Sequence, residues 1–147
     1  MKKIFIILLF FYSFLESEKI FAQSANSATV VVIGNKVGFE STTIKEVKQI
    51  FRGKYSSWKN SQQVTIVLPA SRSESAILVA RVIYSTSVSS MQKFWLSLVF
   101  QGRFNPPIFL ETDQEIITYV KKTPGSIAAI SSETEGVPKN LIININN

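Results

Sequence analysis

Residues 64–76 read Val-Thr-Ile-Val-Leu-Pro-Ala-Ser-Arg-Ser-Glu-Ser-Ala, which places a strand, a polar turn and a helix start in immediate succession. The apolar run Val64–Leu68 predicts a buried strand, and Pro69 ends it. A helix is expected over Glu74–Tyr84, with the serines of the turn as candidate N-caps. A strand that leads through a short turn into a helix is a building unit of α/β domains.

The same alternation continues on both sides of this unit. Further strands are predicted at Ala28–Ile33, Ile108–Leu110, Ser126–Ile130 and Leu141–Ile145. Further helices are predicted at Thr43–Arg52, at Ser89–Gln101 and from Thr112 to Lys122. The pairs Thr43/Glu46 and Thr112/Glu115 have the spacing of a capping box. This order predicts an α/β fold, a three-layer single domain with a largely parallel sheet.

The first residues have the pattern of a cleavable secretory signal. Met1–Lys3 is positively charged, Ile4–Leu15 is almost entirely apolar, and Ala22 offers a small residue to a peptidase. The apolar part is shorter than the roughly 20 residues that span a bilayer, which disfavours a retained membrane anchor. We therefore predict a signal peptide at residues 1–22, cleaved after Ala22 or alternatively after Ser24.

The mature chain is expected to be periplasmic, with a polar leader at residues 23–27 and one domain at residues 28–147. It keeps 13 Lys or Arg and 8 Asp or Glu, a net charge near +5 that is spread along the chain. Such a spread excess favours anionic partners only weakly. Without a basic cluster interleaved with aromatic residues, a nucleic-acid partner is not expected. No membrane-integral state is expected after processing.

The sequence contains neither Cys nor His. Disulfides, thiolate metal sites, Ser/His/Asp triads and the commonest zinc ligand are thereby excluded. A Ser/Lys pair or a carboxylate pair remains open. The carboxylates, however, fall mostly at helix starts or in loops, with no acidic pair at a strand end. We expect no enzyme, no catalytic residue, no metal site and no cofactor.

Ligands of open α/β sheets bind beyond the carboxyl ends of strands, where helices begin. In this chain that place is the turn after Leu68. Its candidate ligand-binding residues are Ser71, Arg72, Ser73 and Ser75. Their hydroxyls, the guanidinium and free backbone N–H groups suit a small oxyanion. The alternative is an ordinary serine N-cap beside a surface Arg, and Glu74 repels an anion in the same turn.

The tryptophans are interpreted mainly as core residues. Trp58 lies in the polar stretch Lys54–Gln63 and is expected to anchor that loop, with a lid or a binding surface as the alternative. On the third predicted helix, four residues keep helical spacing and are expected to face the core. They are Phe94, Trp95, Leu98 and Val99.

Several segments together resemble one lobe of the phosphate-binding periplasmic proteins, the soluble receptors of phosphate ABC importers. They are Ile50–Lys54 followed by Trp58, the unit at residues 64–75, and Thr123–Ala128, which looks like the family's Pro-Gly-Ala-Ile-Gly stretch. Short single-lobe relatives carry a Trp-x-x-x-x-Phe-x-Gly-Arg segment, which is similar to Trp95, Phe100, Gly102 and Arg103. The resemblance covers most of residues 28–130 and implies a periplasmic-binding-protein-like fold.

In the family, an Arg followed by a Ser-Gly-Thr turn grips phosphate. Against the family's Arg-x-Gly-Ser-Gly-Thr, this chain matches at Arg72 and Ser75 but lacks both glycines and the threonine. A two-lobed receptor closes on its ligand from both sides, whereas one lobe supplies half of that cage.

The resemblance implies an exported solute-binding-like protein that binds a small oxyanion such as phosphate in association with transport. An ABC permease or another envelope protein would be its partner. The alternative is a non-transport accessory protein that uses the same fold as a protein-binding module of the cell envelope.

Overall fold

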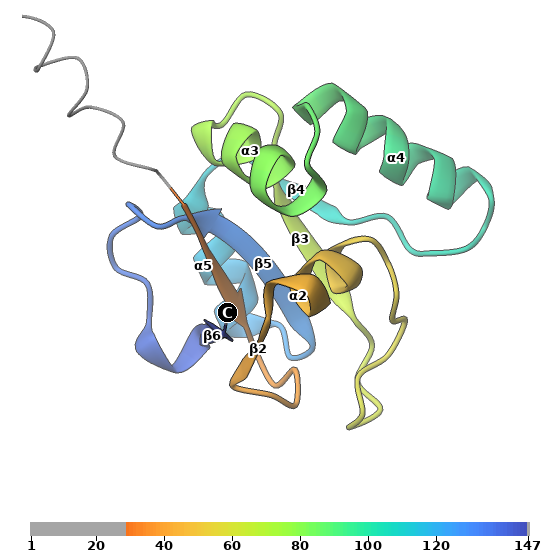
Figure 1. Ribbon diagram of the computed structural model, residues 1–147. Helices are drawn as coiled ribbons and strands as arrows, with labels where there is room; N and C mark the ends of the chain where they lie inside the picture. The colour runs from red at the N-terminus through yellow and green to blue at the C-terminus, as the bar shows by residue number, and fades with distance from the viewer. Residues whose placement is uncertain (1–28, 147) are drawn as a thin grey trace, which may run out of the picture.

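The structure of the protein is a computed structural model that describes residues 29–146 (Figure 1). The predicted signal peptide and polar leader lie outside the described residues. Six strands form one sheet in the order β2-β6-β1-β5-β3-β4. The elements are β1 Val30–Gly34, β2 Ser41–Thr43, α2 Ile44–Phe51, β3 Thr65–Pro69, α3 Glu74–Val79, the π-helix η1 Ala80–Tyr84, α4 Val88–Phe100, β4 Ile108–Leu110, α5 Asp113–Lys122, β5 Ser126–Ser131, the 3-10 helix η2 Lys139–Leu141 and β6 Ile142–Asn146.

The sheet is mixed, with more parallel than antiparallel pairings. β3 runs parallel to both β4 and β5, and β2 runs parallel to β6. β1 lies at the centre and is antiparallel to both of its neighbours, β5 and β6. The predicted α/β class is confirmed, and the parallel part of the sheet is the part that carries the predicted site.

Side chains of the central strands alternate between two cores, because successive residues of a strand point to opposite faces. On one face, Val32 and Leu68 pack with α2, η1 and Trp95 of α4. On the other face, Ile33 and Val67 pack with α5. The domain therefore has the three predicted layers, with most of the helical mass on one side of the sheet.

Helix starts follow the sequence closely, but one of the two expected capping boxes is only half formed. Thr43 Oγ1 accepts a hydrogen bond from Glu46 N at 3.3 Å, yet the Glu46 carboxylate turns away to Tyr55 and Lys54. At α5 the box is complete, since Glu115 also accepts from Thr112 N.

Two elements differ from the sequence-based prediction. The expected helix over Glu74–Tyr84 begins as the α-helix α3 and continues as the π-helix η1. The short strand β2 was not predicted, because its polar residues carry no apolar period. Within residues 29–146, no helix has both the length and the apolar character needed to cross a bilayer.

Candidate functional site

The predicted site lies where three parallel strands end. β3, β5 and β4 finish at the same edge of the sheet, and the backbone N–H of Ala70 donates to Leu110 O at 2.8 Å across that edge. α3 and α5 both begin there. The carboxyl edge therefore brings two helix N-termini together, as a ligand site of an α/β sheet requires.

Ser75 forms the centre of a polar cluster at this edge. Its side chain is only 4% exposed. Its hydroxyl donates to Asp113 Oδ2 at 2.6 Å and accepts from the backbone N–H of Ser131 at 3.0 Å. Thr134 Oγ1 donates to the same carboxylate oxygen at 2.5 Å. Ser75 thus joins the starts of α3 and α5 to the end of β5, and its proton is already given to a carboxylate.

The other three predicted residues have side-chain hydrogen-bond donors that are not used within the described part of the chain. Ser73 is the N-cap of α3, where its oxygen accepts from Ala76 N at 3.1 Å while its own proton stays free to donate. Ser71 and Arg72 are exposed, and their side chains make no hydrogen bond within residues 29–146. All four predicted residues lie in the turn after β3 and the first turn of α3, and among the three serines Ser75 is the one whose hydroxyl proton is already donated.

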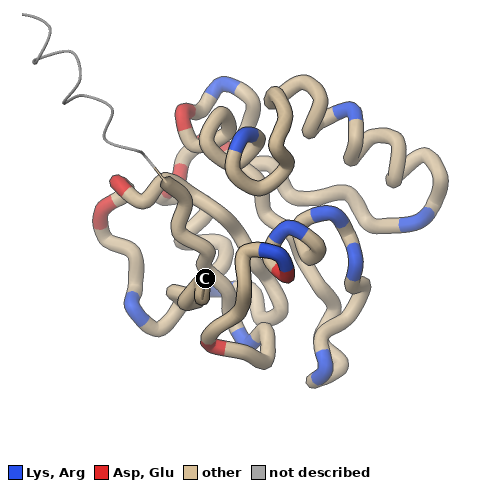
Figure 2. Tube along the Cα trace, viewed as in Figure 1, with Lys and Arg blue, Asp and Glu red and all other residues tan. Residues whose placement is uncertain are grey.

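Acidic residues gather at the carboxyl edge, a distribution that was not predicted from the sequence. Six of the eight acidic residues within residues 29–146 lie in the segments that begin α3 and α5 or that follow β4 and β5 (Figure 2). They are Glu74, Glu111, Asp113, Glu115, Glu133 and Glu135. In this part of the chain no group of three acidic residues is placed to hold a metal ion.

Sequence reasoning missed Asp113 and Thr134 as members of the site. Asp113 is 38 residues from Ser75, and nothing local links the two positions. The one usable signal was topological, because parallel strands bring the turns after β3, β4 and β5 to one edge.

A cavity lies at the opposite edge, where β3 and β4 begin. Its volume is about 520 Å³, and its lining includes Gln63, Trp95, Arg103 and Tyr119. Arg103 is the only charged side chain in that lining. The predicted turn does not contribute to this cavity.

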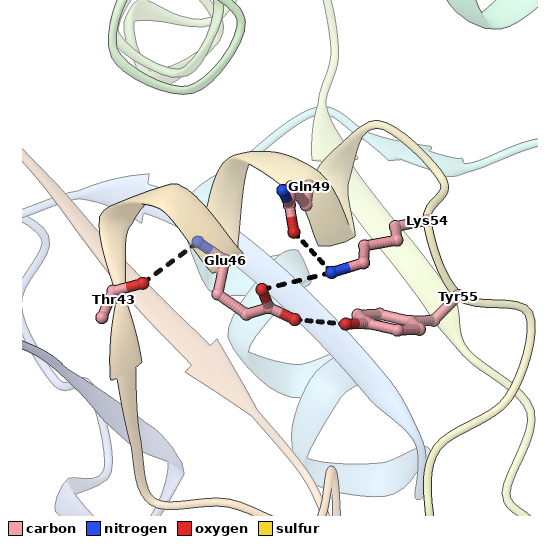
Figure 3. A network of polar contacts seen from close by, with 5 residues as sticks. All are labelled: Thr43, Glu46, Gln49, Lys54 and Tyr55. Atoms are coloured by element: carbon pink, nitrogen blue, oxygen red, sulfur yellow. Dashed lines mark hydrogen bonds and ion pairs between the residues drawn. The ribbon is translucent and has the colours of Figure 1, made fainter.

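The loop after α2 is held by a separate polar network (Figure 3). Tyr55 Oη and Lys54 Nζ both donate to the Glu46 carboxylate, and Lys54 also donates to Gln49 Oε1 at 2.5 Å. The hydrogen bond from Tyr55, and then the charge of Lys54, lower the pKa of Glu46 below its ordinary value. The contacts are local to α2 and its loop, so the network is structural.

Trp58 confirms its predicted role as a loop anchor. Its ring is 6% exposed and meets Phe39 edge to face at 5.6 Å. Its indole N–H donates to Gly125 O at 2.8 Å, and the backbone N–H of Thr65 donates to the same oxygen at 3.1 Å. The loop is therefore tied to the turn before β5, and Trp58 is not a free binding surface.

No protein-family model matches the sequence, and no curated protein matches it. Solved structures do match the fold. PstS from Borrelia burgdorferi is similar with a TM-score of 0.56 and 19% identity, covering 82% of this chain and 48% of that chain. A possible phosphate binding protein from Planctomyces limnophilus is similar with a TM-score of 0.55 and 12% identity, covering 80% of this chain and 40% of that chain.

This chain spans about half the length of the structures that it matches. At such low identity the similarity concerns the fold and not the ligand. It nevertheless agrees with the resemblance predicted from the sequence. Residues 29–146 therefore share their fold with part of each of these two structures.

Proposed function

We propose that this chain is an exported solute-binding-like protein that binds a small oxyanion such as phosphate in association with transport. The observation that carries the proposal is that Arg72 is exposed, with no hydrogen bond to its side chain within residues 29–146, at the edge where the parallel strands β3, β4 and β5 end. Binding would use Ser71, Arg72 and Ser73 as donors, with Ser75 shaping the turn. The names of the two similar structures, PstS and a possible phosphate binding protein, support phosphate as the ligand.

The acidic surroundings select the kind of oxyanion. A fully deprotonated anion such as sulfate would be repelled by the carboxylates at this edge. Phosphate still carries a proton near neutral pH, so it can donate to Asp113 while its oxygens accept from Arg72 and the hydroxyls. We therefore propose that phosphate binds in preference to sulfate.

The remaining parts of the proposal follow from the same assignment. The protein would work in the periplasm after removal of residues 1–22, would not be an enzyme, and would deliver its ligand to an ABC permease or to another envelope protein. A single lobe contacts the oxyanion from one side only and would bind it weakly, so the partner protein would complete the binding site.

Calorimetry of the chain that begins at Gln23 tests the binding site. Arg72→Ala should weaken phosphate binding about tenfold or more, because a charge-assisted hydrogen bond is lost. Arg81→Ala is the matched control, since it removes an exposed cation from η1, away from the turn. An equal loss of phosphate affinity in both variants would mean that phosphate responds only to the net charge of the protein. That result would contradict the proposal.

Two acidic positions sharpen the test. Asp113→Asn should lower the phosphate-to-sulfate preference about tenfold, because the acceptor charge is removed. Glu74→Gly should tighten phosphate binding, because a competing carboxylate leaves the turn. If neither the native chain nor Glu74→Gly binds phosphate, the oxyanion proposal fails.

The second candidate is a non-transport accessory protein that binds partners through its surface. Two observations favour it: the Ser75 hydroxyl is already donated to Asp113, and Phe100 on α4 is 82% exposed. Absence of phosphate binding, together with an intact fold, would select this candidate.

A further inference from the structure

The outer side of α4 is an apolar stripe with a cation in it. Lys93, Leu96 and Phe100 stand at positions i, i+3 and i+7, which lie on one side of a helix. Leu96 is 55% exposed and Phe100 is 82% exposed, whereas Met91 and Trp95 on the opposite side are buried. The inner side of α4 thus serves the core, and the outer side lacks cover within residues 29–146.

The charge around this stripe has one sign. No Asp or Glu occurs between Glu74 and Glu111, while Arg81, Lys93 and Arg103 fall inside that interval. Arg103 is held at the end of α4, since its backbone N–H donates back to Leu98 O at 3.2 Å. Along α4 and the loop after it, Figure 2 shows basic residues and no acidic ones. A partner for this face must combine apolar material with negative charge.

A second copy of the chain does not fit that requirement. In a two-fold dimer the same patch meets itself, so Lys93 and Arg103 would face cations of like sign. An anionic bilayer surface supplies both features, because acyl chains lie directly beneath charged headgroups. A bilayer also needs no groove shaped to receive Phe100, which protrudes from α4.

We propose that the outer face of α4, formed by Lys93, Leu96 and Phe100, docks on an anionic membrane, with the exposed Arg103 just after the helix as a second cation nearby. The helix lies along the surface, with Phe100 and Leu96 in the interfacial layer and the two cations among the headgroups. This inference rests on exposure and charge, and it is independent of the oxyanion proposal. The carboxyl edge with its six acidic residues belongs to other elements and would not take part in the contact.

Vesicle co-sedimentation tests the proposal with phosphatidylcholine vesicles that contain about a third phosphatidylglycerol, compared with pure phosphatidylcholine. The native chain of residues 1–147 should bind the anionic vesicles, and binding should fall at high ionic strength. The double variant Leu96→Gln/Phe100→Gln should bind about tenfold or more weakly, because the inserted apolar area is lost. Lys93→Glu/Arg103→Glu should lose the preference for anionic vesicles.

The controls address background binding and folding. Ile44→Ser removes an exposed apolar side chain from α2 and should leave vesicle binding unchanged. The first 28 residues are the same in every variant, and the series is repeated on the chain beginning at Gln23, which holds every described element and both cores. Thermal melts should show that all variants fold like the native chain, since every substituted side chain is exposed.

Three results would overturn the proposal. The first is equal binding of the native chain and the Leu96→Gln/Phe100→Gln variant to anionic vesicles. The second is failure of the native chain to bind them. The third is a sedimentation-equilibrium experiment in which the native chain is a dimer and the same double variant is a monomer. The outer face of α4 would then be the contact between two copies of the chain.

Discussion

Tyr84 ties three helices together through a single hydroxyl. Its O–H donates to Phe51 O at the end of α2 at 2.7 Å and accepts from Trp95 Nε1 of α4 at 2.8 Å. Tyr84 is itself the last residue of η1, and its own carbonyl accepts from Arg52 Nη2 at 3.0 Å. Burial raises the pKa of Tyr84 above its ordinary value. The neutral phenol is therefore the form that the fold stabilises.

Replacing Tyr84 with Phe should lower the free energy of unfolding by about 1–3 kcal/mol, since the substitution leaves the Trp95 N–H and the Phe51 carbonyl buried without a partner. Urea unfolding measures the loss. Tyr119→Phe is the matched control, because the Tyr119 hydroxyl makes no hydrogen bond within residues 29–146. A similar loss in both variants would show that the Tyr84 hydroxyl has no special role.

The raised pKa of Tyr84 also predicts an alkaline effect. A group whose pKa is higher in the folded state contributes its full stability below its unfolded value, near pH 10, and loses that stability as pH rises above it. The free energy of unfolding should therefore decline above about pH 10 in the native chain and in Tyr119→Phe. The decline should be smaller in Tyr84→Phe, and equal slopes in all three proteins would contradict the assignment.

At the scale of single residues, the sequence predicted which side chains are buried better than it predicted their hydrogen-bond partners. Trp58 and Trp95 were both expected in the core, and both lie there. Their hydrogen-bond partners, Gly125 and Tyr84, could not be predicted, because helical spacing identifies a buried face but not the polar atom that meets it. Ser75 was predicted as a site residue, but its hydrogen bond to Asp113 was missed for the same reason, since Asp113 comes from another helix.

At the scale of elements, α2 and α5 begin with the same type of N-cap, but only α5 has a complete capping box. Thr43 and Thr112 each accept from the residue three positions later. Only at α5 does the Glu side chain return, with Glu115 Oε2 accepting from Thr112 N at 3.3 Å and from Glu111 N at 3.0 Å. At α2 the corresponding Glu46 is occupied by Tyr55 and Lys54.

Thr112→Ala should therefore cost more stability than Thr43→Ala. Loss of an N-cap costs about 0.5–2 kcal/mol, and the Thr112 substitution also loosens the return contact from Glu115. Thermal or urea unfolding of the two variants measures the difference. Equal costs would show that the return contact adds nothing to the cap.

Elements with strong local signals were predicted, and those without such signals were not. α5 has its cap, apolar period and basic last turn in the sequence, and it forms where expected. β2 consists of Ser41–Thr43 and exists because β6 lies beside it in parallel, which no local pattern reveals. The change from α3 to η1 likewise has no signature in the residues.

For the whole molecule, the order of strands and helices predicted the fold class, whereas the distribution of charge was missed. The acidic residues appear scattered along the sequence. Six of the eight within residues 29–146 come to one edge because three parallel strands end there. A pattern that depends on topology becomes visible only when the strand order is known.

Processing is the prediction that concerns the chain as a whole. Mass spectrometry of the protein expressed in a secreting host should find a new N-terminus at Gln23, or at Ala25 if the alternative bond is cut. The expectation rests on the short apolar segment after Met1–Lys3. A product that retains Met1 would contradict cleavage.

The central position of β1 has a consequence for how the protein is made. β1 leaves the ribosome about 100 residues before its two sheet partners, β5 and β6. The hydrogen bond from Thr29 to Ser132 joins residues 103 apart. Contacts so distant along the chain slow folding, because a long loop must close before they form. Native folding of this sheet therefore waits for synthesis of β6, and this delay suits the proposed export, because a chain that folds late is still unfolded when it crosses a membrane.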